Sequence, residues 1–219
     1  AISITMFLGF NVFVDFMYSS MKTTKPYTPD ITLVSEQGLS SGLYTQLAEL
    51  EGVKHVYGRM LDHVDAVFDT SLLTENYKKE IGDIQTSYDG LLDAPEKSWL
   101  ISYDQKQLDW ARTDLLEGTL SEERLIRENG IIAVRDTIHD GNPMITADFK
   151  LGDKVYIDTV LGRKEFTVMA VLQKVPFSDS SLNLTQLITT EKQFTAITGQ
   201  NTLKAIDIQL QKDSQEQTI

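Results

Sequence analysis

The pattern that most restricts the fold of this chain is a pair of β-α-β units that lie far apart in the sequence. In the first unit, Ile31–Ser35 (ITLVS) is rich in β-branched residues and is predicted to be a strand. Gly52 ends the helix predicted after it, and Val53–Met60 (VKHVYGRM) is predicted to be the returning strand. Leucines at helical spacing form one apolar face of that helix: Leu39, Leu43, Leu47 and Leu50.

The second unit lies near the other end of the chain. Leu184–Thr189 (LTQLIT) is predicted to be a strand, and Thr190 with Gln193 has the spacing of a capping box at the start of a helix. Gly199 suits the end of this helix because glycine adopts the left-handed conformation easily. Leu203–Leu210 (LKAIDIQL) alternates with period two and is predicted to be the returning strand.

Neither unit has enough strands to bury its own apolar helix face. We therefore expect the two units to combine into one four-stranded sheet with two helices on one face, the split β-α-β or ferredoxin-like arrangement of an α+β fold. In this prediction, residues 30–68 and 183–212 form the split subdomain, and the strands at 31–35 and 203–210 lie in the same layer.

Residues 69–182 are predicted to be an inserted, mostly-β subdomain with some helical pieces. An Asn129–Gly130 turn signal precedes one strand, and alternating segments on either side of Gly162 indicate a β-hairpin. The predicted elements are helices at Leu72–Ile81 and Asp104–Leu116, a strand at Ile131–Arg135, and a hairpin of Lys154–Val160 with Glu165–Gln173.

The N-terminal segment Ala1–Val14 (AISITMFLGFNVFV) has no charge and no polar stripe. As a helix it spans about 21 Å, less than the ~30 Å of a bilayer core, so a buried core helix is one interpretation. A signal peptide would need a basic segment and a small-residue cleavage site, and this stretch has neither. Because the chain does not begin with Met, we expect residues 1–20 to be the outer end of a transmembrane helix.

Composition excludes several classes of function. The chain has 20 basic and 32 acidic residues, a net charge of −12, and no basic stripe, which argues against nucleic acid as a partner. It contains no cysteine, so disulfide scaffolds, thiolate metal sites and cysteine nucleophiles are excluded.

The sequence lacks the motifs that usually mark catalysis or cofactor binding. There is no phosphate-binding glycine loop, no GxSxG elbow and no HExxH helix. His55, His63 and His139 do not have metal-ligand spacing, and the Asp62–Asp65 segment (DHVD) is interpreted as solvated surface. We therefore predict no catalytic residue, no cofactor and no metal site, and the sequence indicates no ligand-binding residue.

Other polar and aromatic residues are assigned structural roles. The carboxylate pairs Glu122/Glu123 and Asp148/Asp153 are interpreted as solvated faces of an acidic protein. Trp99 and Trp110 are expected in the core.

The order of several short motifs resembles the extracytoplasmic domain of MacB/FtsX-type ABC transporter permeases. Gly52–Val56 (GVKHV) is similar to the sequence motif that follows the first helix in this family. Gly152–Ile157 (GDKVYI) and Phe166–Leu172 (FTVMAVL) are similar to its hairpin, with Ala170 in place of the usual glycine. Trp110–Gly118 and the strand at Ile131–Val134 follow the family's order between these motifs, so the resemblance covers nearly the whole chain.

The resemblance implies a non-catalytic domain on the extracellular side of a cell membrane, attached through residues 1–20. It implies an ABC ATPase subunit as partner, reached through the rest of the permease, and a permease dimer. The domain would bind a substrate or partner, or would transmit ATP-driven motion of the membrane helices. Two alternatives are a free-standing extracellular binding protein without a transport role and a hydrolase with a nonstandard acidic site. The hydrolase lacks convergent residues in the sequence.

Overall fold

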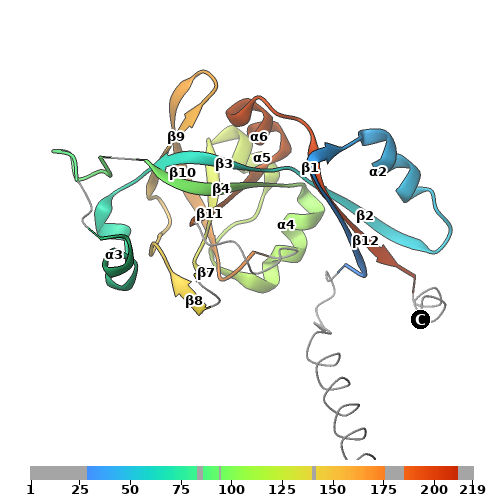
Figure 1. Ribbon diagram of the computed structural model, residues 1–219, viewed down its shortest axis with the longest axis horizontal. Helices are drawn as coiled ribbons and strands as arrows, with labels where there is room; N and C mark the ends of the chain where they lie inside the picture. The colour runs from blue at the N-terminus through green and yellow to red at the C-terminus, as the bar shows by residue number, and fades with distance from the viewer. Residues whose placement is uncertain (1–28, 83–85, 94, 140–141, 176–184, 212–219) are drawn as a thin grey trace, which may run out of the picture.

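The computed structural model describes residues 29–82, 86–93, 95–139, 142–175 and 185–211. Their strands form a three-stranded sheet, a seven-stranded sheet and a two-stranded ribbon, with short helices between them (Figure 1). The α+β class is confirmed. The expected membrane segment at residues 1–20 lies outside the described residues. Within the described ranges, no helix combines the length and the apolar character that crossing a bilayer requires.

The small sheet joins the two ends of the described chain. Its strands are β1 (Ile31–Leu39), β12 (Leu203–Leu210) and β2 (Val53–Arg59), in the order β1-β12-β2. Strand β12 is antiparallel to both neighbours, with Ile31 opposite Ile208 and Val56 also opposite Ile208. Strands β1 and β2 therefore run parallel to each other, and α2 (Ser41–Ala48) connects them. The expected pairing of the 31–35 and 203–210 strands is confirmed.

Helix α2 is shorter than the leucine spacing predicts. The Ser40 hydroxyl oxygen accepts the Leu43 amide at 3.1 Å, which sets the first turn of the helix after Leu39. Leu39 therefore belongs to β1, and Leu50 lies beyond the helix with 55% of its surface exposed. The remaining apolar residues of this unit pack on the buried side chains of Val56, Ile206 and Ile208: they are Leu39, Leu43 and Leu47 with Leu33 and Val53.

The large sheet closes on itself. Its order is β5-β10-β6-β11-β4-β3-β9, and β9 pairs with β10 as well as with β3, so six strands form a closed barrel with β5 attached to β10. The expected hairpin around Gly162 is confirmed as β9 and β10. The strands are β3 (Leu61–Val67), β4 (Glu96–Tyr103), β5 (Leu115–Gly118), β6 (Gly130–Val134), β9 (Lys154–Thr159), β10 (Gly162–Leu172) and β11 (Thr185–Thr190).

The central strands of the barrel are buried on both faces. In β6, Ile131 and Ala133 join one apolar cluster, whereas Ile132 and Val134 join another. Helices α4 (Gln105–Ala111) and α5 (Glu122–Arg127) contribute Leu108 and Leu125 to the second cluster. Helix α6 (Glu191–Thr198) contributes Phe194 and Ile197 to the first.

Two predicted helices are shorter in the structure. The 72–81 segment divides into a 3-10 turn at Thr70–Leu72 and α3 (Glu75–Ile81). The 104–116 segment ends its α-helix at Ala111, continues as a 3-10 turn (Arg112–Asp114) and then becomes β5. The capping pair Asp104/Gln107 is present as a reciprocal capping box. The remaining strands are β7 (Asp136–His139) and β8 (Asn142–Ile145), which form the ribbon.

The second predicted β-α-β unit does not stay together in one sheet. Strand β11 pairs with β4 and β6 in the barrel, and α6 packs on the barrel, whereas β12 lies in the small sheet. The expected four-stranded ferredoxin-like sheet is therefore wrong in this detail: the small sheet has three strands and one helix. All six residues of β11 are buried, and only the middle of a covered sheet buries both faces of a strand.

The chain passes from the small sheet into the barrel at Met60 and returns to the small sheet between Gly199 and Leu203. The predicted subdomain boundaries lie elsewhere, at residues 68 and 183. The division of the chain into a split subdomain and an insert remains a prediction about folding units.

The packing of the small sheet predicts a stability change. Replacing the fully buried Ile206 by Ala removes apolar contacts with α2 and should lower the free energy of unfolding by about 2–5 kcal/mol. Leu50→Ala is the matched control, and we expect a change within about 0.5 kcal/mol because Leu50 is exposed. Urea unfolding of both variants measures the difference, and equal effects would contradict the packing described here.

Candidate functional site

The small sheet and the barrel meet at a junction through which the chain passes twice. Strands β2 and β3 are separated by Met60 alone, so one nearly continuous strand runs from the small sheet into the barrel. The Met60 amide donates to the Ser102 hydroxyl at 2.8 Å, and the Ser102 amide donates to the Met60 carbonyl at 3.0 Å. These bonds attach the crossing point to β4. The second crossing runs from Gly199 to Leu203.

A buried ion pair lies on the face of the small sheet opposite α2. Arg59 Nη2 donates to Asp207 Oδ1 at 3.0 Å, and the Thr32 hydroxyl donates to the same oxygen at 2.8 Å. Arg59 Nε lies 2.8 Å from Asp207 Oδ2 outside hydrogen-bond geometry, so this second contact is mainly one of charge. Burial raises the pKa of the Asp207 carboxyl above its ordinary value of 3.8, against the opposing effects of Arg59 and Thr32.

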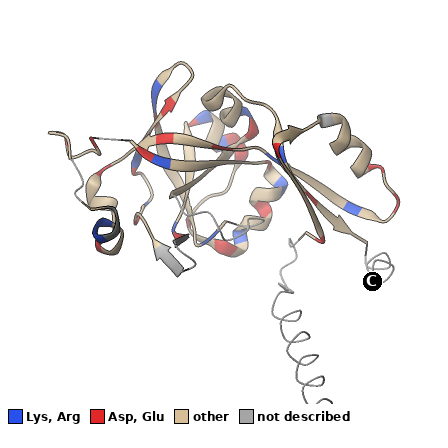
Figure 2. Cartoon of the chain, in the orientation of Figure 1, with Lys and Arg blue, Asp and Glu red and all other residues tan. Residues whose placement is uncertain are grey.

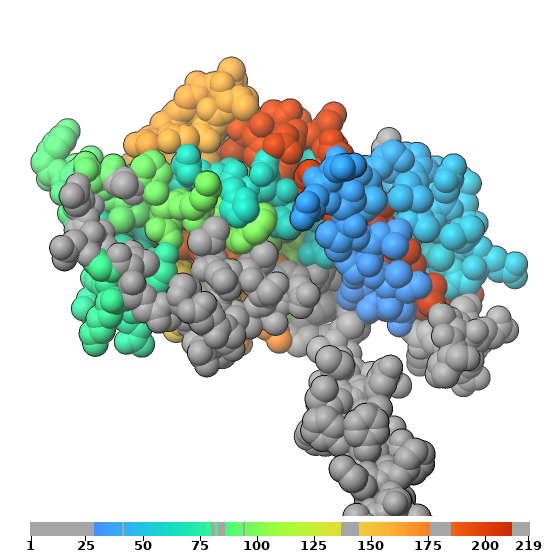
Figure 3. Space-filling view, viewed as in Figure 1, coloured from blue at the N-terminus to red at the C-terminus, as the bar shows by residue number. Residues whose placement is uncertain are grey.

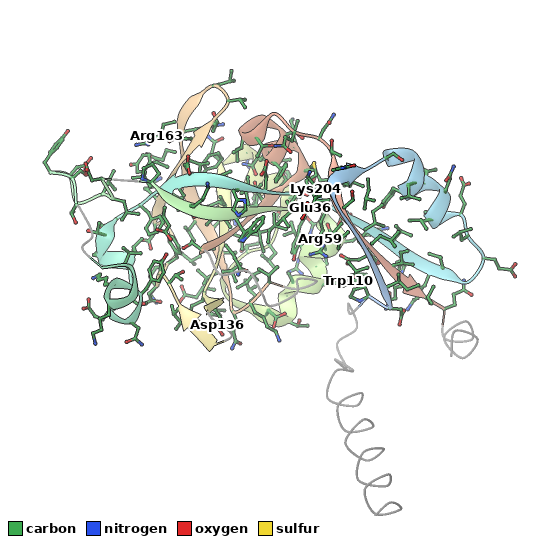
Figure 4. The ribbon with its side chains drawn as sticks, viewed as in Figure 1. Glu36, Arg59, Trp110, Asp136, Arg163 and Lys204 are labelled. Atoms are coloured by element: carbon green, nitrogen blue, oxygen red, sulfur yellow. The ribbon has the colours of Figure 1, made fainter. Side chains whose placement is uncertain are left out.

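Aromatic side chains connect this face to α4. The rings of Tyr57 and Trp110 lie 4.2 Å apart between centroids, and His55 lies 5.8 Å from Tyr57 and 6.1 Å from Trp110. Arg59 and Trp110 are both at the junction in the side-chain view (Figure 4). Trp110 is only partly buried, so the prediction of a core residue is wrong. Its ring packs between the two bodies, where it covers β2.

Gln107 links the same helix to the edge of β2. Its Oε1 accepts the Asp104 amide at 2.9 Å within the capping box of α4. Its Nε2 donates to the Gly58 carbonyl at 3.3 Å, and the residue is fully buried. The residue that caps α4 therefore also holds that helix against the small sheet. The space-filling view shows the two bodies side by side (Figure 3).

A cleft of about 670 Å³ opens at the junction, within the size range of small-ligand sites. Helix α2 forms one wall with Tyr44 and Thr45, and α6 forms the facing wall. The remaining lining residues come from the edge of β2, the N-terminus of α4 and the second crossing. They are Gly58, Met60, Asp104, Asn201 and Leu203, whereas α6 contributes Glu191, Lys192 and Thr195.

Negative charge gathers at the α4 and α6 side of this cleft. Water reaches Glu191, but the concave wall removes part of its hydration, and this desolvation together with Asp104 and Glu122 raises the pKa of Glu191. Partial burial, Asp104 and Glu191 raise the pKa of Tyr44, whose hydroxyl donates to the Val56 carbonyl at 3.1 Å. The carboxylates of Asp104 and Glu191 therefore both raise the pKa of Tyr44, which lies in the opposite wall of the cleft. Lys192 is the basic residue among the lining residues.

His55 and His63 lie in different parts of the fold. His55 belongs to the aromatic group at the junction, whereas His63 stacks on Trp99 at 3.7 Å on the barrel. Trp99 is partly buried and is therefore not the expected core residue. In the chain segments that the structure describes, no three His, Cys, Asp or Glu side chains come together in a way that would hold a metal ion.

Of the carboxylate pairs considered from sequence, Glu123 and Asp148 are exposed and contact basic side chains, whereas Glu122 and Asp153 are half-buried. Glu123 pairs with Arg127 at 2.9 Å, and Asp148 pairs with Lys150 at 2.9 Å. Asp153 accepts the Lys150 amide at 2.7 Å. Basic and acidic residues are interspersed along the ribbon rather than separated into stripes (Figure 2).

The sequence did not indicate the cleft, because its walls come from segments more than 140 residues apart. Its one sequence signal is the capping box Asp104/Gln107, which marks the start of α4. Nothing in the sequence places Glu191 opposite Tyr44. The capping pair at Thr190 is only partly as expected: Thr190 caps α6 at 3.2 Å, but the Gln193 amide group donates to the Leu125 carbonyl at 2.9 Å.

Comparison with solved structures returns extracytoplasmic domains. One match is the extracellular domain of the noncanonic ABC-type transporter YknZ from Gram-positive bacteria, at 14% identity and a TM-score of 0.49, covering 88% of this chain and 84% of that chain. Another is the periplasmic region of MacB from Actinobacillus actinomycetemcomitans, at 10% identity and a TM-score of 0.45, covering 85% and 72%. No family model and no curated protein sequence matches the chain.

The buried ion pair predicts a strong effect of removing one partner. Arg59→Met leaves the Asp207 carboxyl buried without its counter-charge and should lower the free energy of unfolding by about 3–5 kcal/mol at neutral pH. The double variant Arg59→Met/Asp207→Leu should lose much less, because both charges are removed together. Urea unfolding compares the variants. A double variant as unstable as Arg59→Met would contradict this account.

The ion pair also predicts a direction for titration. Because the folded-state pKa of Asp207 is raised, the stability that this group contributes is fully present below pH 3.8 and is lost as the pH rises through the folded pKa. Carboxyl ¹³C NMR should place the Asp207 pKa above 3.8, and Arg59→Met should raise it further. Asp158 is the internal control, since its bond with Arg163 lowers its pKa. An Asp207 pKa below that of Asp158 would refute the prediction.

Proposed function

We propose that this chain is the extracellular domain of an ABC transporter permease, without catalytic chemistry of its own. In this proposal its partners are an ABC ATPase subunit, reached through the rest of the permease, and a second permease copy. The order of the sequence motifs supports it, since GDKVYI and FTVMAVL form the β9–β10 hairpin and GVKHV begins β2.

The observation that carries the proposal is that the two ends of the fold lie together. The Asp30 amide donates to the Ile208 carbonyl at 2.9 Å, and the Asp30 carboxylate accepts the Leu210 amide at 2.7 Å. The Gln211 amide donates to the Gly52 carbonyl at 2.8 Å. A domain held between two membrane segments needs this arrangement, because both of its connections must reach the same surface.

The junction supports a role in transmitting motion. The nearly continuous run of β2 and β3, the bonds at Met60 and the contact of Trp110 with Tyr57 couple the small sheet to the barrel. A rotation applied at the paired ends of the small sheet would therefore move the barrel with it, as in rigid-body transitions of packed domains. The alternative is a free-standing extracellular binding protein, which the cleft at the junction favours.

Thiol labelling of the full-length gene product in intact cells tests the location. The 219 residues contain no cysteine, so Tyr88→Cys places a single thiol in this domain at a fully exposed position. We expect a membrane-impermeant maleimide to label it without permeabilisation. Ala133→Cys is the matched control, which should react only after denaturation because Ala133 is buried. Labelling of Tyr88→Cys only in permeabilised cells would refute the extracellular location.

A second measurement separates the permease from the free-standing protein. Affinity purification of the full-length gene product from detergent-solubilised membranes should recover an ATPase subunit. Recovery of the protein in the soluble extracellular fraction without an ATPase would support the alternative.

A further inference from the structure

We propose that the outer edge of β1 binds an extended, uncharged apolar segment of another protein, which adds as a fourth strand to the small sheet. The proposal concerns recognition by this domain alone, and it holds whether or not the domain belongs to a transporter. Three observations carry it: backbone groups of β1 that point outward, incompletely buried apolar side chains beside them, and the low charge of the surrounding surface.

Strand β1 presents two residues whose backbone groups point away from the sheet. The Ile208 carbonyl accepts the Asp30 amide at 2.9 Å, so the backbone groups of Ile208 face β1, and those of its partner Ile31 face β12. Because successive residues of a strand alternate, the N–H and C=O groups of Thr32 and Val34 point outward. None of these four groups has a hydrogen-bond partner among the described residues. Both residues are exposed, and β1 lies at the molecular surface in the space-filling view (Figure 3).

The other edge strands of the two larger sheets are protected. At β2, side chains from α2 and α4 bond to the Val56 and Gly58 carbonyls. Strand β5 has four residues, one of them Glu117, and short or charged edges resist pairing. In β1, residues 31–35 contain no charge and no proline, and the register with β12 shifts only after Val34. This part of β1 is therefore a template for an added strand.

Apolar side chains on both faces of β1 are incompletely buried. On the face that carries α2, Leu33 is half-buried and Ile31 is 40% exposed. On the opposite face, Val34 is 73% exposed beside Thr32, whose hydroxyl donates to Asp207. No described residue of α2 is fully buried. An added strand with aliphatic side chains would cover Ile31 and Val34 through cross-strand contacts.

The charge of this surface selects an uncharged segment. Residues 31–48, which include β1 and α2, contain one charged residue, Glu36, whereas 24% of the whole chain is charged. Most of the described residues in this range are exposed, and low charge on an exposed surface is typical of the centre of an interface. A second copy of this chain is disfavoured as the occupant because each copy has a net charge of −12.

Hydrogen exchange of the free 219-residue chain in a mild detergent tests the edge itself. The amides of Thr32 and Val34 should exchange at least about tenfold faster than the amide of Leu33, which faces β12. Equal protection of the three amides would show that the edge is already covered, and would overturn the proposal.

Fluorescence anisotropy tests binding to that edge at physiological ionic strength. The probe is a fluorescein-labelled decapeptide of three threonine–valine repeats with glycine–serine ends. One control has glutamate in place of valine, and the other is N-methylated on both residues of its middle repeat. We expect the probe to bind and both controls to fail, because one is acidic and the other cannot complete the strand hydrogen bonds. Binding should also slow exchange of the Thr32 and Val34 amides.

Matched variants of Val34 locate the binding. Val34→Pro removes an outward amide without removing a bond to β12, so it should weaken binding of the probe at least about tenfold. Val34→Thr keeps the amide and the β-branched shape, and should change binding by less than about threefold. Thermal unfolding of each variant verifies that it is folded.

Four binding results would overturn the proposal. The probe could fail to bind the folded chain, or could bind Val34→Pro as tightly as Val34→Thr. The N-methylated control could bind as well as the probe, which would show apolar adhesion without strand addition. Sedimentation could show a dimer that Val34→Pro dissociates, which would make a second copy the occupant. None of these results depends on whether the domain belongs to a permease.

Discussion

The structure depends on one constraint, which is that β12 must pair with β1 and β2 at the same time. This strand comes from the C-terminal part of the described chain and lies between two strands from the beginning. Its two antiparallel ladders hold both ends of the fold together. They also bring Asp207 to Arg59 and Thr32, residues 148 and 175 positions away in the sequence. Without β12, the first β-α-β unit would have two strands that do not touch.

The buried pair makes this arrangement specific rather than simply stable. Moving a carboxylate and a guanidinium out of water is costly, and the raised pKa of Asp207 reflects that cost. A slip of β12 by one residue would turn Asp207 toward the apolar side chains of α2 and would turn Ile206 toward Arg59. The charge therefore disfavours the wrong register more strongly than it stabilises the correct one. The register in turn positions Tyr57 and Gly58 against α4, which forms the junction and its cleft.

Local patterns predicted most of the secondary structure. The caps at Asp104 and Thr190, the glycine at the end of α6 and the hairpin around Gly162 are where the sequence indicates, because each depends on neighbouring residues. The errors arose where a pattern continued past its structural end. Leu39 and Leu50 keep the helical spacing, but the Ser40 cap starts α2 between Leu39 and Leu43. Trp99 and Trp110 are large and apolar, yet they form ring contacts at surfaces and at the junction.

The sequence by itself determined the α+β class, the strand and helix types, the pairing of β1 with β12, and the absence of cysteine chemistry. Only the tertiary structure decided that β11 belongs to the barrel and β12 to the small sheet, because the alternation of apolar residues does not indicate which strand will be the partner. It also decided the cleft, because Tyr44, Gly58, Asp104 and Glu191 come from four separate elements. Propensity and capping act over a few residues, whereas sheet order and clefts depend on contacts between distant residues, which no local pattern encodes.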